Sequence, residues 1–119
     1  MIFGGIDTTG NTIGFLMYHL AANPDKQEIL YKEVSDVVGD DIDEKITESK
    51  LNKVRYLKAT LHESQRMTPS LFGSSRLAAS DYVLSGYLIP KGTMVVNMNQ
   101  VTANNSDNFR DPEQFLPER

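Results

Sequence analysis

The chain has 119 residues, a length that suits one domain with one modest core. Its 39% hydrophobic and 24% charged residues are ordinary values for a globular segment. The net charge of −4 excludes a nucleic-acid binder, because no strong cationic field is present to neutralise phosphates.

Several further classes are excluded by what the 119 residues lack. There is no cysteine, which rules out a disulfide framework and a thiolate metal ligand within them. No apolar run reaches the roughly 18–20 residues of a membrane span. The N-terminus carries no targeting signal. Acidic residues dominate positions 22–50 and basic residues slightly dominate 51–119, so an acidic surface precedes a region that offers a local basic patch.

The first 68 residues read as helices. Residues 1–22 form a mostly apolar segment that we expect to be a helix buried on most sides, with apolar positions at helical spacing: Ile13, Leu16, Met17 and Leu20. Asn23-Pro24 marks the start of a second helix that Gly39 ends. An acidic loop follows, then a short helix capped by Thr47, and then a long helix over residues 54–67.

The pattern changes after Thr68-Pro69. Four short strands are expected, at residues 74–78, 81–84, 87–89 and 93–97, with turns at Gly86 and at residues 90–92. A polar loop with one helical turn follows. Helices first and then a small sheet indicate an α+β fold that is mainly helical.

The first candidate constellation lies in residues 4–9. Gly4 and Gly5 inside a helix each cost roughly 1 kcal/mol relative to alanine, so a close approach to the helix backbone is the expected reason for them. Asp7 beside Thr8 offers a carboxylate and a hydroxyl, which together suit proton relay to a small ligand. By itself the pattern also fits a frayed helix start capped by Asp or Thr.

The second constellation pairs Glu63 with Arg66, three residues apart on one helix face. Exposed pairs of this kind are common and contribute little to stability. A buried pair needs a further partner, and Arg119 in the terminal Phe-Leu-Pro-Glu-Arg is the candidate.

The order and spacing of these motifs resemble the C-terminal half of cytochromes P450. The Gly-Gly-x-Asp-Thr-Thr helix precedes the Glu-x-x-Arg helix, the strand–turn segment 86–93 follows, and a Phe-x-Pro-Glu-Arg ending comes last. The resemblance covers essentially the whole chain. It implies a fragment of the P450 fold: a long buried helix, two further helices and a small sheet.

The resemblance assigns roles on the oxygen side of a heme b cofactor. Gly4 and Gly5 would form a groove for dioxygen. Thr8 would hydrogen-bond to the bound oxygen, and Asp7 would supply protons from solvent. The acid–alcohol pair favours oxygen activation, and thus a monooxygenase that inserts one oxygen atom of O₂ into a small apolar substrate.

Other roles follow from the same resemblance. Glu63, Arg66 and Arg119 would form a structural triad beneath the heme. Arg76 would bind a heme propionate, with a surface arginine at a strand edge as the alternative. The apolar residues Leu71 and Phe72 would line the substrate pocket, with core packing as the alternative.

Within the family, residues 18–27 and 54–59 look like the animal mitochondrial group, in which an acidic ferredoxin supplies electrons. Lys58 fits one docking position, whereas His62 stands where a lysine is usual. Membrane association, favouring the mitochondrial inner membrane, is implied for the full-length protein. The alternative is the endoplasmic reticulum, with NADPH–P450 reductase as the electron donor.

The cysteine that binds the heme iron is expected beyond Arg119. Residues 1–119 would therefore be a partial P450 domain that lacks the N-terminal half and the cysteine loop, and the chain alone is expected to be inactive. Two alternatives remain: a non-catalytic truncated product that at most binds a ferredoxin, and an unrelated α+β binding module. A sterol, a fatty acid and a xenobiotic all remain open as substrate.

Overall fold

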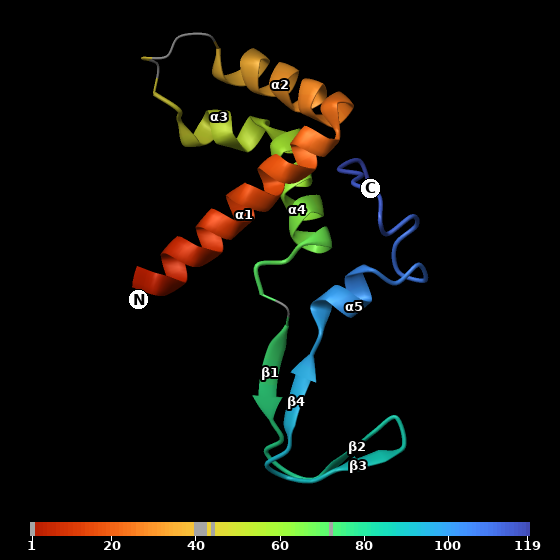
Figure 1. Cartoon of the computed structure of the whole chain (residues 1–119). Coiled ribbons are helices and arrows are strands. Elements are labelled where there is room, and N and C mark those ends of the chain that lie inside the picture. The colour runs from red at the N-terminus through yellow and green to blue at the C-terminus, as the bar shows by residue number, and fades with distance from the viewer. Residues whose placement is uncertain (1, 40–42, 44, 72) are drawn as a thin grey trace.

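A computed structural model of the chain describes residues 2–39, 43, 45–71 and 73–119. The molecule is elongated, with extents of 60 × 36 × 23 Å, and the helices and strands occupy opposite ends (Figure 1). The elements are, in chain order, α1 (Ile2–Ala22), α2 (Pro24–Val38), α3 (Glu48–Lys53), α4 (Arg55–Met67), β1 (Ser74–Leu77), β2 (Tyr82–Leu84), β3 (Tyr87–Ile89), β4 (Met94–Asn97) and α5 (Asn99–Ala103). The expectation of a mainly helical chain with a few paired strands is confirmed at this level, and the strands pair antiparallel.

The helix boundaries follow local signals. Asn23 precedes Pro24 at the first position of α2, and Gly39 ends α2 with a φ of 86°, a left-handed value that glycine adopts freely. The hydroxyl of Thr47 accepts a hydrogen bond from the backbone N–H of Lys50 at 3.3 Å and so caps α3. These short-range features lie where the sequence predicts them.

The start of α4 is capped from another helix. Val54 occupies the cap position and has no side-chain oxygen to offer. Glu33 of α2 accepts instead, from the backbone N–H of Tyr56 at 2.8 Å and from that of Leu57 at 3.1 Å. A carboxylate at the positive end of a helix is favourable, so this contact fixes α4 against α2.

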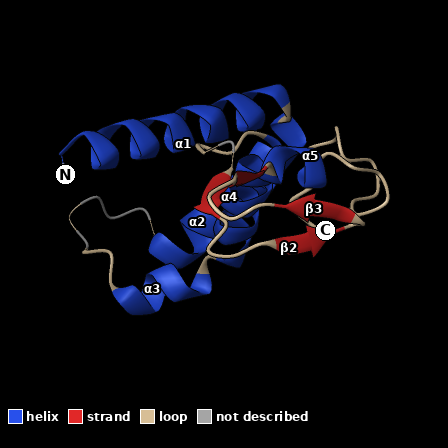
Figure 2. Cartoon of the chain, turned by 90° about the horizontal axis from the view of Figure 1, so that it is seen from below, coloured by secondary structure: helices blue, strands red, loops and turns tan. Residues whose placement is uncertain are grey.

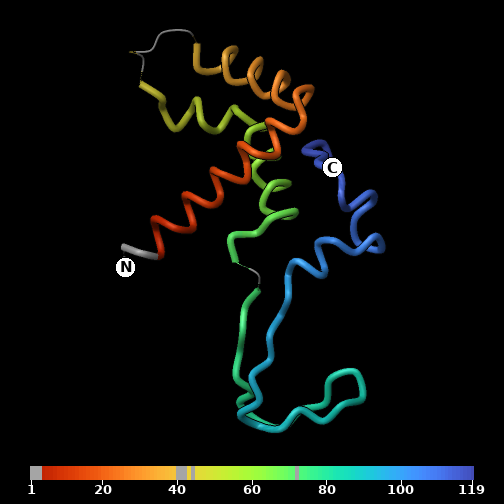
Figure 3. The backbone as a smooth tube through the Cα atoms, in the orientation of Figure 1, coloured from red at the N-terminus to blue at the C-terminus, as the bar shows by residue number. Residues whose placement is uncertain are grey.

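The buried centre lies where α1, α2, α4 and the C-terminal segment meet. Its buried side chains are mostly on α4 and its neighbours: His19, Leu30, Val54, Thr60, Glu63, Ser64 and Phe115. Figure 3 shows the C-terminal segment returning from α5 to the side of α4. This return brings residues near 115–119 against a helix more than fifty positions earlier.

The prediction that the first helix is buried on most sides is wrong for this chain. Ile13 is 51% and Met17 65% exposed. The N-terminal part of α1 extends away from α2 and α3 in two orthogonal views (Figures 1 and 2). Within the described residues α1 meets α2 and α4 towards its C-terminal end, so apolar periodicity there does not translate into burial.

The strands form two separate ladders where the sequence suggests one small sheet. β1 pairs antiparallel with β4, with Ser74 opposite Asn97, and β2 pairs with β3 in a hairpin. The hairpin turn holds Ser85 and Gly86 at φ values of 51° and 85°, which suits a tight turn between twisted strands. Because β1 pairs with β4, the β2–β3 hairpin between them in the sequence forms a separate two-stranded sheet.

Candidate functional site

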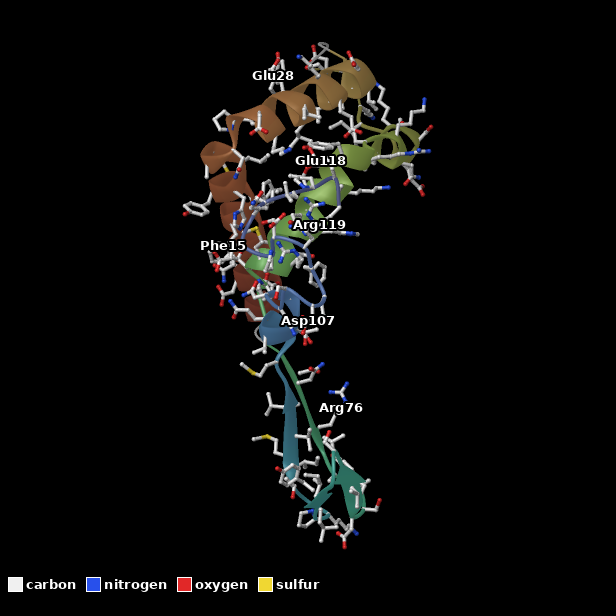
Figure 4. The ribbon with its side chains drawn as sticks, turned by 90° about the vertical axis from the view of Figure 1, so that its right-hand side faces the viewer. Phe15, Glu28, Arg76, Asp107, Glu118 and Arg119 are labelled. Carbon is white, nitrogen blue, oxygen red and sulfur yellow. The ribbon has the colours of Figure 1, made fainter. Side chains whose placement is uncertain are left out.

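A buried carboxylate holds two arginines together beside α4. Glu63 is 4% exposed. Arg66 donates from Nε to Glu63 Oε2 at 2.9 Å and from Nη2 to Oε1 at 3.0 Å, a two-point contact along one helix face. Arg119 donates from Nε to the same Oε1 at 2.9 Å, and Figure 4 shows its side chain lying against α4. The structure thus brings together all three residues of the expected triad.

The remaining donors of both guanidinium groups reach backbone carbonyls. Arg66 donates to the carbonyl oxygens of Ala103 at 2.8 Å and Pro112 at 2.9 Å. Arg119 donates to Asp111 at 3.0 Å and also to Arg110. Buried charges are tolerated when their other hydrogen-bonding groups are satisfied, as they are here. The cluster therefore ties α5 and the C-terminal segment to α4.

The Glu63 carboxylate is held in its charged form. Burial alone raises the pKa of Glu63, but hydrogen bonds from Arg66, from the backbone N–H of Leu116 and from Arg119 outweigh burial and lower that pKa below its ordinary value. A carboxylate whose pKa is lowered and which accepts four hydrogen bonds from three residues is suited to holding structure and not to transferring protons.

The oxygen-side constellation lies on the extended part of α1. Thr8 is half-buried and donates from Oγ1 to the carbonyl of Gly4 at 2.6 Å. Asp7 is exposed and makes no hydrogen bond within the described part of the chain. A Cβ added to Gly4 or to Gly5 would meet no described atom within 4 Å, so packing inside these residues does not require glycine there.

A cavity of about 730 Å³ separates α1 from the end of α4 and from α5. Thr8 and Leu71 both line it, so the structure places these two predicted residues around the same cavity. Leu71 is 68% exposed, which contradicts a core-packing role within this chain. Phe72, the other predicted pocket residue, lies outside the described residues. The lining comprises Thr8, Thr9, Thr12, Ile13, Leu61, Gln65, Arg66, Pro69, Ser70, Leu71, Asn99 and Ala103.

Comparison with known proteins gives the family. The family model for cytochrome P450 matches residues 1–119. The chain belongs to the cytochrome P450 family. The alternative prediction of an unrelated α+β binding module is therefore wrong.

Several of the relatives are named as mitochondrial. The chain is 38% identical over its whole length to cytochrome P450 302a1, mitochondrial, of Drosophila melanogaster. It is 40% identical over its whole length to probable cytochrome P450 12a5, mitochondrial, of the same species. It is 38% identical, over 96% of its residues, to the mitochondrial 1,25-dihydroxyvitamin D(3) 24-hydroxylase of Rattus norvegicus. It spans 24%, 22% and 22% of those proteins respectively. The resemblance to the animal mitochondrial group is confirmed.

The remaining predicted P450 residues lie apart from the cavity. Arg76 stands exposed on β1, where its Nη1 donates to the carbonyl of Ser75 at 2.9 Å, and Figure 4 shows it well away from the helices. Lys58 is exposed on α4 and donates to Asn52 Oδ1 at 3.3 Å. Within the described residues neither cation makes another hydrogen bond or an ion pair, so both can meet a carboxylate.

The chemistry of these residues fits part of a heme site. Heme presents a broad apolar ring with two carboxylates at one edge. The open cavity suits an apolar ring, whereas Arg76 lies apart from the cavity, so the described residues do not bring a ring site and a propionate partner together. The axial ligand is a different matter. The 119 residues contain no cysteine, and no group of three metal-ligating side chains occurs in the described portion. None of the described helices is long and apolar enough to cross a membrane.

Two clusters were missed by reasoning from the sequence. His19 is buried, stacks on Phe115 with ring centroids 5.0 Å apart, and hydrogen-bonds through Nε2 to Thr68 Oγ1 at 3.0 Å. Burial is the main cause that lowers the pKa of His19; Glu63 raises that pKa and Arg66 lowers it further. The sequence signal was a lone histidine on an apolar helix, which is ordinary for a packed residue.

The second missed cluster centres on Glu118. Its Oε1 accepts from Lys26 Nζ at 2.9 Å and from the Tyr56 hydroxyl at 2.9 Å. Burial, followed by the hydrogen bond to Glu118, raises the pKa of Tyr56 and keeps the phenol protonated. One carboxylate thus joins α2, α4 and the C-terminal segment. The contacts span 92 and 62 residues in sequence, and no local pattern encodes them.

Proposed function

We propose that the full-length protein containing this chain is a heme-dependent monooxygenase that inserts one oxygen atom of O₂ into a small apolar substrate. The observation that carries the proposal is the position of Thr8 on the cavity wall, with Asp7 exposed beside it, in a chain of the P450 family. The reaction balances as substrate, one O₂, two electrons and two protons giving hydroxylated product and water.

The protein's own contribution is proton delivery on the oxygen side. The heme-thiolate group, when bound, supplies the reductive activation of dioxygen. The single proton of Thr8 is donated to the carbonyl of Gly4, so the hydroxyl must turn about its Cβ–Oγ1 bond before it can donate into the cavity. Asp7 faces solvent and can take up a proton from water. Gly4 and Gly5 leave the α1 backbone open for a small ligand.

We assign the structural triad to the fold and not to this chemistry. Glu63, Arg66 and Arg119 are hydrogen-bonded to one another and to backbone groups, which holds the C-terminal segment against α4. Arg66 also contributes to the cavity wall. Leu71 supplies an exposed apolar surface there, which suits an apolar substrate.

We propose that Arg76 binds a heme propionate and that the iron ligand is a cysteine outside residues 1–119. These residues would then form the oxygen-side part of a P450 domain whose N-terminal half and cysteine loop come from elsewhere in the full-length protein. A guanidinium suits a carboxylate because it can donate two parallel hydrogen bonds. The support is the exposed Arg76, bonded only to Ser75 within the described chain.

The proposed electron donor is an acidic ferredoxin, and the proposed location is the mitochondrial inner membrane. The support is the set of relatives named as mitochondrial, together with the exposed Lys58 on α4. A cationic surface steers an acidic partner and raises its association rate. A flavoprotein reductase in the endoplasmic reticulum is the competing arrangement. Measuring reduction rates with each donor over a range of salt concentrations separates the two.

The proposed function is tested on the full-length protein in two steps. The reduced protein with carbon monoxide should show the Soret band of a heme thiolate, and its absence would refute the proposal. Asp7→Asn should then lower product formation about 100-fold, the usual size of a lost proton-transfer group. Thr8→Ala should raise the fraction of O₂ released as hydrogen peroxide. Asp36→Asn, at an exposed aspartate of α2, is the matched control and should leave both quantities unchanged.

A further inference from the structure

A hydroxyl pair joins α1 to the loop that follows α4. Thr12 Oγ1 lies 2.7 Å from Ser70 Oγ, although the two residues are 58 positions apart in sequence. Both side chains are partly buried and both line the cavity that Thr8 and Leu71 share. A second side-chain hydrogen bond, from His19 to Thr68, joins α1 to the start of the same loop, nearer the C-terminal end of α1.

The single proton of the Thr12 hydroxyl determines which residue of the pair is the hydrogen-bond donor. Thr12 Oγ1 also lies 2.8 Å from the carbonyl oxygen of Thr8, which can only accept. A threonine hydroxyl has one proton, so Thr12 donates it to Thr8 and must accept from Ser70. The chain of donors therefore runs from Ser70 through Thr12 to the peptide of Thr8. Chains of this kind polarise each successive bond and strengthen it.

The pair connects the two functional walls of the cavity. Thr12 is one helical turn after Thr8, so the two hydroxyls lie on the same face of α1. Ser70 is the immediate neighbour of Leu71. A contact of 2.7 Å between the two walls sets the separation between the proton-donating side and the apolar side.

We propose that Thr12 and Ser70 are positioning residues that hold the substrate-facing loop at a fixed distance from Thr8. The inference rests on the proposed monooxygenase function and deepens it, because it names what keeps an apolar substrate in line with the oxygen side. Loss of the pair lets the loop move away from α1. Water then enters the cavity, and reduced oxygen leaves as peroxide in place of being transferred to substrate.

The test uses the full-length protein with Thr12→Val, Ser70→Ala and the double variant. Thr12→Val keeps the side-chain shape and removes the hydroxyl, whereas Thr12→Ser keeps the hydroxyl. Thr102→Val is the matched control, because Thr102 is an exposed threonine of α5 that does not line the cavity and makes no side-chain hydrogen bond in the described chain. Hydrogen exchange over residues 68–71 is read by mass spectrometry, and peroxide formed per O₂ consumed is read with a ferredoxin-type donor.

The expected result is specific to the hydroxyl pair. Thr12→Val and Ser70→Ala should each speed exchange over residues 68–71 about tenfold, the size of one partly buried hydrogen bond. The double variant should match the single variants, since one contact is lost in each case. Thr12→Ser should retain wild-type exchange. The peroxide fraction should rise severalfold in Thr12→Val and stay low in Thr12→Ser and Thr102→Val.

Three outcomes overturn the proposal. Equal exchange in Thr12→Val and Thr12→Ser would show that the hydroxyl does not hold the loop. If the increase in exchange rate in the double variant equals the product of the two single-variant increases, the two residues act separately. Faster exchange with an unchanged peroxide fraction would remove the positioning role. A wild-type protein without a heme-thiolate band would instead refute the proposed function, and the exchange data would still decide whether the tether exists.

Discussion

The cap that Glu33 places on α4 yields the sharpest stability prediction. The carboxylate accepts from the backbone N–H groups of Tyr56 and Leu57 at 2.8 and 3.1 Å and is half-buried. Loss of a helix cap costs about 0.5–2 kcal/mol, and a charge at a partly buried helix end contributes up to about 2 kcal/mol. Because two bonds and a charge are lost together, Glu33→Ala should cost about 2 kcal/mol.

This loss is measurable as local opening of α4. About 2 kcal/mol corresponds to a roughly 30-fold rise in exchange rate, so the amides of Tyr56 and Leu57 should exchange that much faster in Glu33→Ala. Glu33→Gln keeps one oxygen acceptor and loses the charge, so its effect should be about half as large in free energy. Native-state hydrogen exchange on the full-length protein resolves both amides.

The matched control is Glu28→Ala on the same helix. Glu28 pairs with Lys32 at 3.3 Å on the exposed face of α2, and such a pair is worth about 0.3–0.5 kcal/mol. It should leave the exchange of Tyr56 and Leu57 within about twofold of wild type. The capping argument is refuted if both variants change those amides equally, or if Glu33→Ala leaves them protected.

Three further predictions concern the buried groups and the iron ligand. Glu63→Gln should destabilise the protein by about 3 kcal/mol, because it leaves two arginines with side chains 8% and 19% exposed without their counter-charge; a thermal midpoint equal to that of Glu113→Gln, an exposed control, would contradict this. His19 has a lowered pKa in the folded state, so the unfolded chain binds a proton at this residue more readily than the folded chain does. The contribution of neutral His19 to the free energy of unfolding is therefore fully present above the unfolded pKa of about 6.5, and it is lost as the pH falls through the folded pKa. The denaturation midpoint should therefore fall less steeply between pH 8 and pH 5 in His19→Gln than in the wild type. An equal fall in the two proteins would contradict a lowered pKa of His19. Hemin added to residues 1–119, reduced and exposed to carbon monoxide, should give no thiolate-type Soret band, because those residues contain no cysteine; observing the band would disprove that expectation.

Short-range features could be predicted from the sequence because neighbouring residues alone decide them. Pro24 and Gly39 bound α2, Thr47 caps α3, and Ser85-Gly86 turns the hairpin, each through backbone geometry that a few adjacent residues determine. Glu63 and Arg66 share one helix face because they are three residues apart. The family also followed from the order of motifs along the chain, and the match over residues 1–119 agrees with it.

Contacts between distant segments were decided only by the tertiary structure. Lys26 reaches Glu118 across 92 residues, Glu33 caps a helix 23 residues later, and Thr12 meets Ser70 across 58. No helical or strand periodicity specifies such partners, since they depend on how packed helices place their side chains. Burial was decided in the same way. The apolar stripe of α1 specifies a helix, but its exposure follows from which elements pack against it, and α1 meets its neighbours only towards one end.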